Sequence, residues 1–440
     1  MNIVIPKPVN EVLYMINEKG YEAYVTGGAV RNNVMGVKVS KYDISTNAEL
    51  SVVEKMIKSY DTFYRGENNS KLGVNNPKYP MAISKYRGVD NTLEGDLALR
   101  DFTMNALAFS EDDGLIDYGT GVIDIQNKVI RVNGTEDSVF LNDPLRILRA
   151  IRLSGEYGMR IDIETQSYMN DDRELLKGVA VERIRDELSK LLVVPRCEFY
   201  IKKYFDIFLE ILPELALLEG FNQNDPNHIY DALEHTFVSM KCVEPTLELR
   251  LAMLFHDIGK PFTYSKGNDG YAIYKDHAIR SSYIARGILN RLRFNKKVIQ
   301  KVIKLIEFHD YEVPTNDMKL KQFINKLGVE NIDDLYKVKK ANFYAKNPAC
   351  VSLLKKIEEE YERMKAVVRK TSFIRKNELK LNGKDLILLG VDQDNVGKVI
   401  DHLYYEIITG NLKNNKEKLT DYVVNQVVGN LDNVMVGEIV

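Results

Sequence analysis

A glycine turn followed by an arginine is the first feature with chemical potential. Gly27-Gly28-Ala29-Val30-Arg31 stands between a strand-like segment, residues 23–26, and a helical segment, residues 30–35. Glycines allow backbone amides to approach an anion closely, and a helix N-terminus adds positive potential. The Arg31 guanidinium can donate two charge-assisted hydrogen bonds. The turn therefore suits a phosphate, although a tight strand-to-helix connection without a ligand has the same pattern.

A group of histidines is the second feature. Four of the six histidines, His235, His256, His277 and His309, lie within one stretch, and Asp257 follows His256 directly. Imidazole and carboxylate ligands suit Mn, Fe, Ni, Co or Zn, and such a metal activates water against a phosphoester. Residues 251–260 also resemble the signature of HD metal phosphohydrolases, in which an earlier histidine, here His235, is a ligand. The alternative is a helical module that keeps the signature without turnover.

The length and composition exclude several classes of protein. At roughly 150 residues per domain, 440 residues predict about three domains. With 45 % apolar residues the chain is not disordered, and 61 basic against 63 acidic residues exclude a globally basic nucleic-acid coat. Three distant cysteines predict neither a disulfide framework nor a cysteine zinc site. Without a signal peptide or an apolar run of about 18 residues, we expect a cytoplasmic protein that spans no membrane.

The predicted secondary structure that positions these residues changes along the chain, from mixed strands and helices to helices alone. Strand-like segments at residues 3–5, 23–26, 42–46, 103–109 and 128–132 alternate with helices, starting with residues 9–19, and predict an α/β domain. Beyond residue 135 apolar residues recur at helical spacing. We therefore expect an α/β head followed by an all-α remainder. We divide the chain into residues 1–135 (head), 136–225 (neck), 226–335 (HD-type body) and 336–440 (tail).

Six segments in chain order resemble motifs of the class II tRNA nucleotidyltransferase and poly(A) polymerase family. These are the glycine turn with residues 41–48, and residues 93–106, 117–124, 142–152, 182–188 and 381–386. The resemblance implies a polymerase-β-like head followed by a helical neck, an HD-type body and a tail. It also implies transfer of CMP and AMP from CTP and ATP to the 3′ end of tRNA, with Mg²⁺ in the head.

The resemblance also assigns roles to individual residues. It implies that Asp43 is the catalytic metal ligand. The implied nucleotide-binding residues are Gly28, Arg31, Arg100, Asp101, Asn105, Asp143, Arg146 and Arg149.

The metal-binding motif departs from the family pattern. Two carboxylates spaced by two residues project from one face of a strand, but the first position here is Lys41. A protonated lysine cannot bind a metal, and a positive charge beside a dication is unfavourable. Asn32 and Asn142 also stand where the family has acids. Either Asp96 or Asp101 replaces the missing ligand, or the head keeps its fold with weakened or lost transfer.

Asp143 and Arg146, three residues apart, share one face of a predicted helix. Because Pro144 suits a first helical position, Asp143 is also a candidate N-cap. The resemblance implies that this pair reads the base: the carboxylate accepts from the amino group of cytosine or adenine, and the guanidinium donates to the ring nitrogen.

Basic residues predict the RNA contacts. Residues 369–384 hold six cations and one acid, Glu378, which suits a phosphate track, although most charge runs are solvated faces. Second candidates on the neck are Arg183, Arg185 and Lys190. The sequence thus favours a tRNA nucleotidyltransferase. The alternatives are an HD phosphohydrolase with a nucleotide-binding head, and an RNA-binding protein without catalysis.

Overall fold

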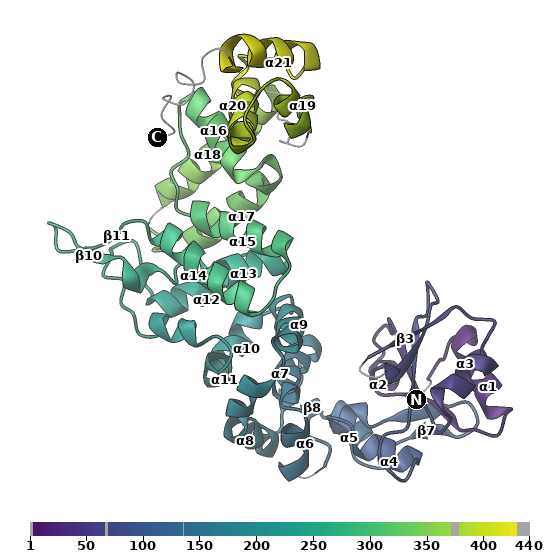
Figure 1. Cartoon of the computed structure of the whole chain (residues 1–440). Helices are drawn as coiled ribbons and strands as arrows, with labels where there is room; N and C mark the ends of the chain where they lie inside the picture. The colour runs from purple at the N-terminus through teal and green to yellow at the C-terminus, as the bar shows by residue number, and fades with distance from the viewer. Residues whose placement is uncertain (1–2, 67–68, 135, 350, 371–377, 429–440) are drawn as a thin grey trace. The chain divides into compact units, whose positions relative to one another are not determined.

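The computed structural model describes residues 3–66, 69–134, 136–349, 351–370 and 378–428 (Figure 1). The chain divides into two compact units, Met1–Pro213 and Glu214–Val440. Unit 1 joins the predicted head to most of the predicted neck, and the four-segment division remains a proposal. Among the described helices, none is long and apolar enough to cross a membrane.

Unit 1 begins with a seven-stranded mixed sheet in the order β3-β4-β5-β2-β1-β6-β7. All neighbouring strands are antiparallel except β2 and β5, which are parallel. Val25 and Ile44 are fully buried at the centre of the sheet, and the register places Thr26 opposite Asp43. The strands are β1 Ala23–Thr26, β2 Tyr42–Thr46, β3 Thr62–Arg65, β4 Lys71–Val74, β5 Met81–Lys85, β6 Ala108–Ser110 and β7 Gly114–Ile116.

Short helices pack around this sheet. Helix α1 buries Val9, Val12, Leu13 and Ile16, whose spacing of three or four residues forms one apolar face. The other helices of the head are α2 Gly28–Val34, α3 Leu50–Met56, α4 Leu93–Ala98 and α5 Gly121–Gln126, after α1 at Lys7–Asn17. These helices and strands confirm the mixed α/β head.

Two strand predictions are wrong. Residues 3–5 form no strand, and of residues 103–109 only the end lies in β6. The start is a single 3-10 turn, Thr103–Asn105. Thr103 Oγ1 donates to Asp124 Oδ2 at 2.7 Å and Asn105 Nδ2 donates to Asp101 Oδ1 at 2.8 Å. These local side-chain bonds replace the strand ladder.

The rest of unit 1 is helical apart from one short parallel pair, β8 Val129–Ile130 with β9 Arg160–Ile161. Helices α7 and α9 pack on each other, with Leu148 and Leu188 buried. The helices are α6 Glu136–Asn142, α7 Leu145–Tyr157, α8 Ile163–Asp171, α9 Val181–Leu192, α10 Cys197–Lys203 and α11 Phe205–Leu209. The predicted change to helical structure is confirmed.

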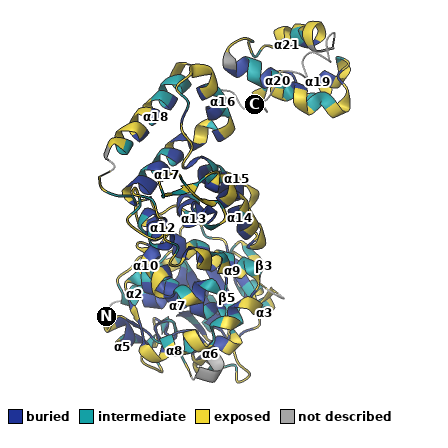
Figure 2. Cartoon of the chain, turned by 90° about the vertical axis from the view of Figure 1, so that its left-hand side faces the viewer, coloured by how far each residue is buried: buried dark blue, intermediate teal, exposed yellow. Residues whose placement is uncertain are grey.

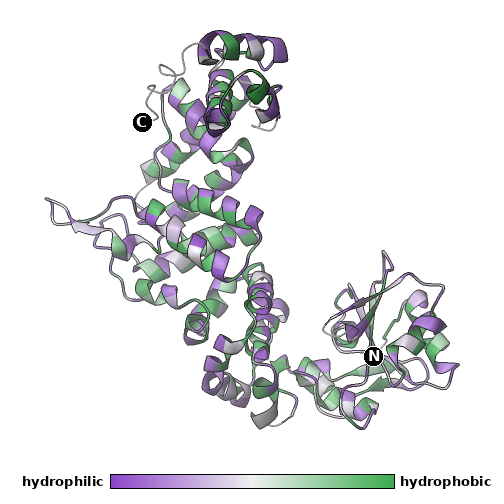
Figure 3. Ribbon diagram, viewed as in Figure 1, coloured by the Kyte–Doolittle hydropathy of each residue, from purple (hydrophilic) through white to green (hydrophobic). Residues whose placement is uncertain are grey.

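Unit 2 is helical, with one two-stranded hairpin of β10 Tyr264–Lys266 and β11 Ala272–Tyr274. Residues 249–255 of α13 are all buried (Figure 2). In most other helices hydrophobic and hydrophilic residues alternate, as expected where one face is buried (Figure 3). The helices up to residue 370 are α12 Ala232–Lys241, α13 Leu247–Phe255, α14 His277–Arg291, α15 Lys296–Phe308, α16 Asp317–Leu327, α17 Ile332–Tyr344 and α18 Val351–Lys370.

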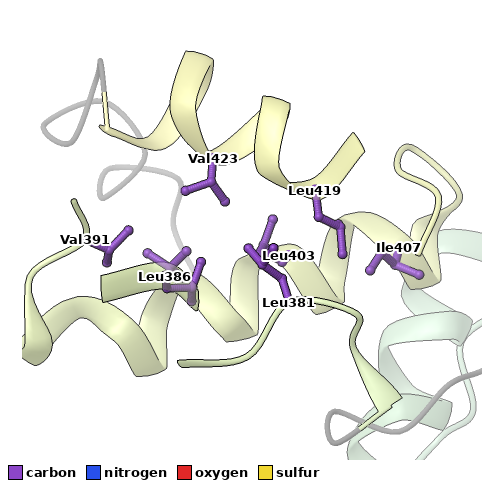
Figure 4. Close-up of a cluster of buried hydrophobic side chains, with 8 residues drawn as sticks. Leu381, Leu386, Val391, Leu403, Ile407, Leu419 and Val423 are labelled. Atoms are coloured by element: carbon purple, nitrogen blue, oxygen red, sulfur yellow. The ribbon is translucent and has the colours of Figure 1, made fainter. Parts of the chain in front are cut away.

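The tail forms its own small core from helices α19 Gly383–Leu388, α20 Val396–Thr409 and α21 Lys416–Tyr422. Leu386, Leu403 and Leu419 are fully buried there (Figure 4). Asn382 begins α19 with a capping box: its side chain accepts from the backbone of Asp385, and the Asp385 side chain accepts from the backbone of Asn382. The predicted break at Asn382 is therefore a helix start.

Candidate functional site

All nine residues predicted for the nucleotide site, six from the head and three from the neck, line one cavity of about 740 Å³ in unit 1. Its lining also includes Lys71, Arg87, Arg152, Glu156 and Tyr157. Seven cationic side chains therefore face four carboxylates. This excess of positive charge suits a polyanionic ligand.

The glycine turn forms one wall of the cavity. Gly27 has φ +68°, and a Cβ at this position would lie 2.5 Å from Arg100 Nη1. Gly28 begins α2 directly after it. Glycine is therefore required at residue 27 on two grounds, backbone conformation and space.

Arg31 organises the wall instead of reaching into the open cavity. Its guanidinium donates to Asn105 Oδ1 at 2.6 Å and to the Tyr157 hydroxyl at 2.7 Å, and it stacks on the Tyr157 ring at 4.5 Å. Nε and Nη2 also donate to Asn32 Oδ1, at 3.1 and 2.9 Å. The asparagine at residue 32, where the family has an acid, thus binds the adjacent arginine.

Arg100 lies deeper, in a buried cluster. Its Nη2 donates to Asp96 Oδ2 at 2.7 Å, Thr26 Oγ1 at 2.9 Å and Ser45 Oγ at 3.0 Å. Burial alone would raise the pKa of Asp96, but Arg100 and then Arg87 hold it below its ordinary value. Asp96 is therefore a buried ion-pair partner.

Asp101 links the head to the helix that follows. Oδ1 accepts from the Phe102 amide and from Asn105 Nδ2, and Oδ2 accepts from Arg149 Nη1 at 2.9 Å. Burial raises the pKa of Asp101, and Arg149 more than reverses this effect. Asp96 and Asp101 are both paired with arginines, which argues against the hypothesis that either one replaces the missing metal ligand.

The proposed base-reading pair is held at the rim of the cavity. Both oxygens of Asp143 accept from Arg183 Nη2 on α9, at 3.0 and 2.9 Å, while Arg146 Nη2 donates to the Leu99 carbonyl at 3.1 Å. The capping hypothesis is wrong: Pro144 is the N-cap of α7, and no side chain caps this helix. Asp143 directly precedes this N-cap, and its backbone carbonyl accepts from the Arg146 amide at 3.0 Å.

The neck helix α9 supports the arginine row of α7. Glu187 Oε2 accepts from Arg152 Nε at 2.6 Å, and its Oε1 lies 3.8 Å from Arg149 Nε. Burial raises the pKa of Glu187, and Arg152 lowers it below its ordinary value. The neck cations predicted to contact RNA are engaged with acids: Arg183 with Asp143, Arg185 with Asp186 and Lys190 with Glu187.

Lys41 is bound to the one carboxylate that the metal motif retains. Its Nζ lies 2.9 Å from Asp43 Oδ1, and both side chains are about half exposed. Among the described residues that line the cavity, every other carboxylate has an arginine partner. The donor set does not fit a pair of divalent metals, because the motif retains one carboxylate, Asp43, the Lys41 ammonium neutralises it, and the other lining carboxylates are paired with arginines.

The sequence interpretation missed several residues of this cavity. Lys71 and Arg87 come from β4 and the segment after β5, where no motif marks them. Tyr157 lies on α7 about two turns after Arg149, so helical spacing was a usable signal. The pairing of Arg183 with Asp143 joins two segments far apart in the chain.

The predicted histidines converge in unit 2. His235 and His256 Nε2 atoms are 3.2 Å apart, and those of His277 and His309 are 3.3 Å apart. Asp257 lies between the pairs: Oδ2 is 3.5 Å from His235 and 3.2 Å from His256, and Oδ1 is 3.5 Å from His277 and 3.6 Å from His309. Both triads, each sharing Asp257, have the spacing of metal ligands.

The histidine tautomers are set by the backbone. Each Nδ1 faces a carbonyl, for His235 that of Ala345 at 3.1 Å and for His256 that of Met253 at 2.8 Å. The other two follow the same pattern, with the carbonyls of Tyr274 and Ile306. The other ring nitrogen of each histidine, Nε2, faces Asp257, and His235 Nε2 also lies 3.0 Å from Asn342 Oδ1. Burial lowers the pKa of His277 to about 4, which favours its neutral form.

The predicted basic strip of the tail is only partly described, because Arg375 and Lys376 lie outside the described residues. Arg369 and Lys370 end α18. Lys380 is exposed and Lys384 lies on α19. These four cations have no common site in the described part of the chain.

Family models match three parts of the chain. Residues 23–131 match the poly(A) polymerase head domain, and residues 158–218 match a "Probable RNA and SrmB- binding site of polymerase A". Residues 278–423 match domain 2 of tRNA nucleotidyltransferases. The models follow the predicted order of head, neck and helical remainder.

Curated relatives include the CCA-adding enzyme of Lactobacillus johnsonii, 34 % identical over 215 residues, which cover 45 % of this chain and 52 % of the relative. The CC-adding tRNA nucleotidyltransferase of Thermus thermophilus is 29 % identical over 319 residues, covering 69 % and 71 %. The chain thus spans about half the length of the CCA-adding relative.

A solved structure of the Bacillus stearothermophilus CCA-adding enzyme in complex with CTP aligns with a TM-score of 0.63 at 22 % identity, over 98 % of this chain and 100 % of that one. The Thermotoga maritima CCA-adding enzyme complexed with tRNA gives 0.52 at 20 % identity, over 96 % of both. These likenesses establish the fold. In sequence, the family models and the curated relatives show that parts of the chain are similar to poly(A) polymerases and tRNA nucleotidyltransferases.

Proposed function

We propose that this protein transfers CMP and AMP from CTP and ATP to the 3′ end of tRNA. The observation that carries the proposal is the convergence of all nine predicted residues on one cationic cavity. A nucleoside triphosphate is polyanionic, and the cavity has cations in excess over carboxylates. With tRNA as its substrate, the protein would act in the cytoplasm.

The rim of the cavity supplies the proposed base selection. Asp143 presents a carboxylate, held from behind by Arg183, and Arg146 presents donors three residues later. Cytosine and adenine each offer an amino donor beside a ring-nitrogen acceptor, which complements an acid and an arginine. Uracil and guanine reverse this pattern and would leave both protein groups unsatisfied.

The proposed reaction joins the 3′-hydroxyl oxygen of the RNA to the α-phosphorus and breaks the bond to the β-phosphate oxygen, releasing pyrophosphate. In the head, Arg100 and the Arg149–Asp101 pair fix the walls of the site, and Arg31 fixes Asn105. We assign no step to a metal, since the residues do not fit a two-metal site. Because Lys41 stands in place of an acid, we expect slower transfer than with two carboxylates.

The test is incorporation of labelled CTP and ATP into a tRNA that lacks its CCA end, using the full chain. Asp143→Ala and Arg146→Ala should reduce incorporation of C and A and weaken the preference for CTP over UTP. Lys55→Met, an exposed change on α3, is the matched control and should behave as the wild type. Wild-type protein that never extends the RNA would overturn the proposal.

We propose in addition that the histidine cluster binds a divalent transition metal. The Nε2 atoms of four histidines converge on the buried carboxylate of Asp257, whose Oδ1 has no hydrogen-bond partner in the described structure. Lys260 Nζ lies 2.7 Å from Asp257 Oδ2, so the Oδ1 side, toward His277 and His309, is the open side of the carboxylate. Imidazole and carboxylate favour Mn, Fe, Co, Ni or Zn, and the backbone carbonyls orient the ligands. The proposal is limited to metal binding, since the family models match transferase domains and favour transfer over a phosphohydrolase.

Metal content of the purified full chain tests this second proposal. Elemental analysis after exposure to each metal should find bound metal in the wild type and loss of at least tenfold in His256→Ala and Asp257→Asn. His402→Ala, which removes a histidine on α20 that pairs with Tyr422, should keep the metal. Equal metal content in the wild type and His256→Ala would overturn it.

A further inference from the structure

A lysine at residue 41, in place of an acid, changes which charged ligands the head can bind. Lys41 and Asp43 are two residues apart, so both point from the same face of the strand, and their charged atoms are 2.9 Å apart. Their side chains are 41 % and 46 % exposed, so a ligand can reach both. The pair has no net charge where two carboxylates would have two negative charges.

A second lysine lines the cavity together with Asp43. Lys71 begins β4 and lines the same cavity. Burial lowers the pKa of Lys71, while the charge of Asp43 raises it and the charge of Lys41 lowers it further. Two lysines therefore share the surroundings of Asp43, and the three groups together carry a positive charge.

The other carboxylates that line the cavity do not offset the positive charge of Lys41 and Lys71. Asp101 is paired with Arg149, Asp143 with Arg183 and Glu156 with Arg152. A divalent cation entering beside Asp43 would meet two ammonium groups and no free acid among the described lining residues. A phosphate chain would meet the same two ammonium groups as partners.

We infer that the head binds nucleoside triphosphates as metal-free polyanions, with Lys41 and Lys71 supplying the positive charge that a divalent metal would otherwise bring. This inference rests on the proposed function of the cavity as a nucleotide site. According to this inference, Lys41 binds phosphate, and its ion pair with Asp43 positions the ammonium before the nucleotide arrives. When the nucleotide binds, phosphate oxygens contact the Lys41 ammonium in place of the Asp43 oxygen or together with it.

Equilibrium binding of CTP to the full chain tests the inference, with EDTA in one arm and Mg²⁺ in the other. The wild type should bind CTP in EDTA within threefold of its affinity in Mg²⁺, or more tightly. Lys41→Asp should lose at least tenfold in EDTA and recover in Mg²⁺. Lys41→Met should lose affinity in both arms, and Lys55→Met should match the wild type.

The wild type alone decides the central point, so the test does not depend on a variant that folds. Wild-type binding that weakens more than tenfold in EDTA overturns the inference. Incorporation into tRNA separates this outcome from a failure of the proposed function. Metal-free CTP binding without incorporation keeps the inference and overturns transfer, whereas incorporation with binding that needs Mg²⁺ keeps transfer and overturns the inference.

Discussion

Replacing Glu187 on the neck helix should destabilise unit 1 more than any exposed change nearby. Glu187 is 4 % exposed, and its carboxylate lies 2.6 Å from Arg152 and 3.8 Å from Arg149. Glu187→Gln keeps the size of the side chain and removes its charge. Both arginines line the cavity, so the change perturbs the wall of the proposed nucleotide site.

The expected magnitude follows from the partners that remain. Removing one member of a buried ion pair costs about 3–5 kcal/mol. In the variant, Arg152 still has its ion pair with Glu156 at 2.5 Å, and Arg149 still has its ion pair with Asp101 at 2.9 Å. These remaining partners favour the lower end of that energy range. We therefore expect a loss of about 3 kcal/mol, and at about 2–4 °C per kcal/mol for a unit of this size a fall in melting temperature of roughly 6–12 °C.

Scanning calorimetry of the full chain measures this change. Lys190→Met is the matched control, because Lys190 Nζ lies 3.2 Å from the same carboxylate but its side chain is 58 % exposed. Exposed pairs contribute about 0–1 kcal/mol, so the control should melt close to the wild type. A Glu187→Gln variant as stable as Lys190→Met would refute the assignment of Glu187 as a buried anchor.

Three further predictions concern pH, base selection and the glycine turn. The pKa of Glu187 is lower in the folded protein than its ordinary value of 4.5. The ionised Glu187 therefore stabilises the fold fully above pH 4.5, and this contribution is lost as the pH falls through the pKa of the folded state. The urea midpoint of Glu187→Gln should therefore fall less on acidification than that of the wild type. Arg183→Ala frees Asp143, so the preference for CTP over UTP should fall about tenfold in binding assays, and an unchanged preference would exclude Arg183 as its positioning residue. In Gly27→Ala the backbone has φ +68° and the new Cβ lies 2.5 Å from the Arg100 guanidinium, whereas in Gly20→Ala the backbone has φ +80° and the new Cβ has no atom within 4 Å. CTP affinity should drop at least tenfold in Gly27→Ala and stay unchanged in Gly20→Ala. Equal losses of affinity in the two variants would show that the clash with Arg100 has no effect.

The sequence predicted the chemistry of the cavity better than its surrounding strands. The glycine turn, the helix after it and the strand at residues 42–46 were found because apolar periodicity and turn residues are local signals. Strands β3, β4 and β5 were not predicted, since exposed aromatic and polar residues break their alternation, as with Phe63 and Tyr64 in β3. Their place in the sheet depends on long-range pairing of β5 with β2, of β4 with β5 and of β3 with β4, which is a tertiary effect.

The ion pairs show a second limit of sequence reasoning. That Lys41 faces Asp43 followed from a spacing of two along a strand. That Asp101 pairs with Arg149 and Asp96 with Arg100 did not follow from the sequence, because these partners are set by three-dimensional packing. The proline at residue 144 gave a misleading signal for a cap at Asp143, since the helix starts one residue later than expected.

The most direct test of the central claim is the mass of a tRNA 3′ end after incubation with the full chain, CTP and ATP. The account predicts added C and A residues with the wild type, loss of addition in Asp143→Ala, and faster addition in Lys41→Asp when Mg²⁺ is present. A tRNA whose mass is unchanged by the wild type would contradict it.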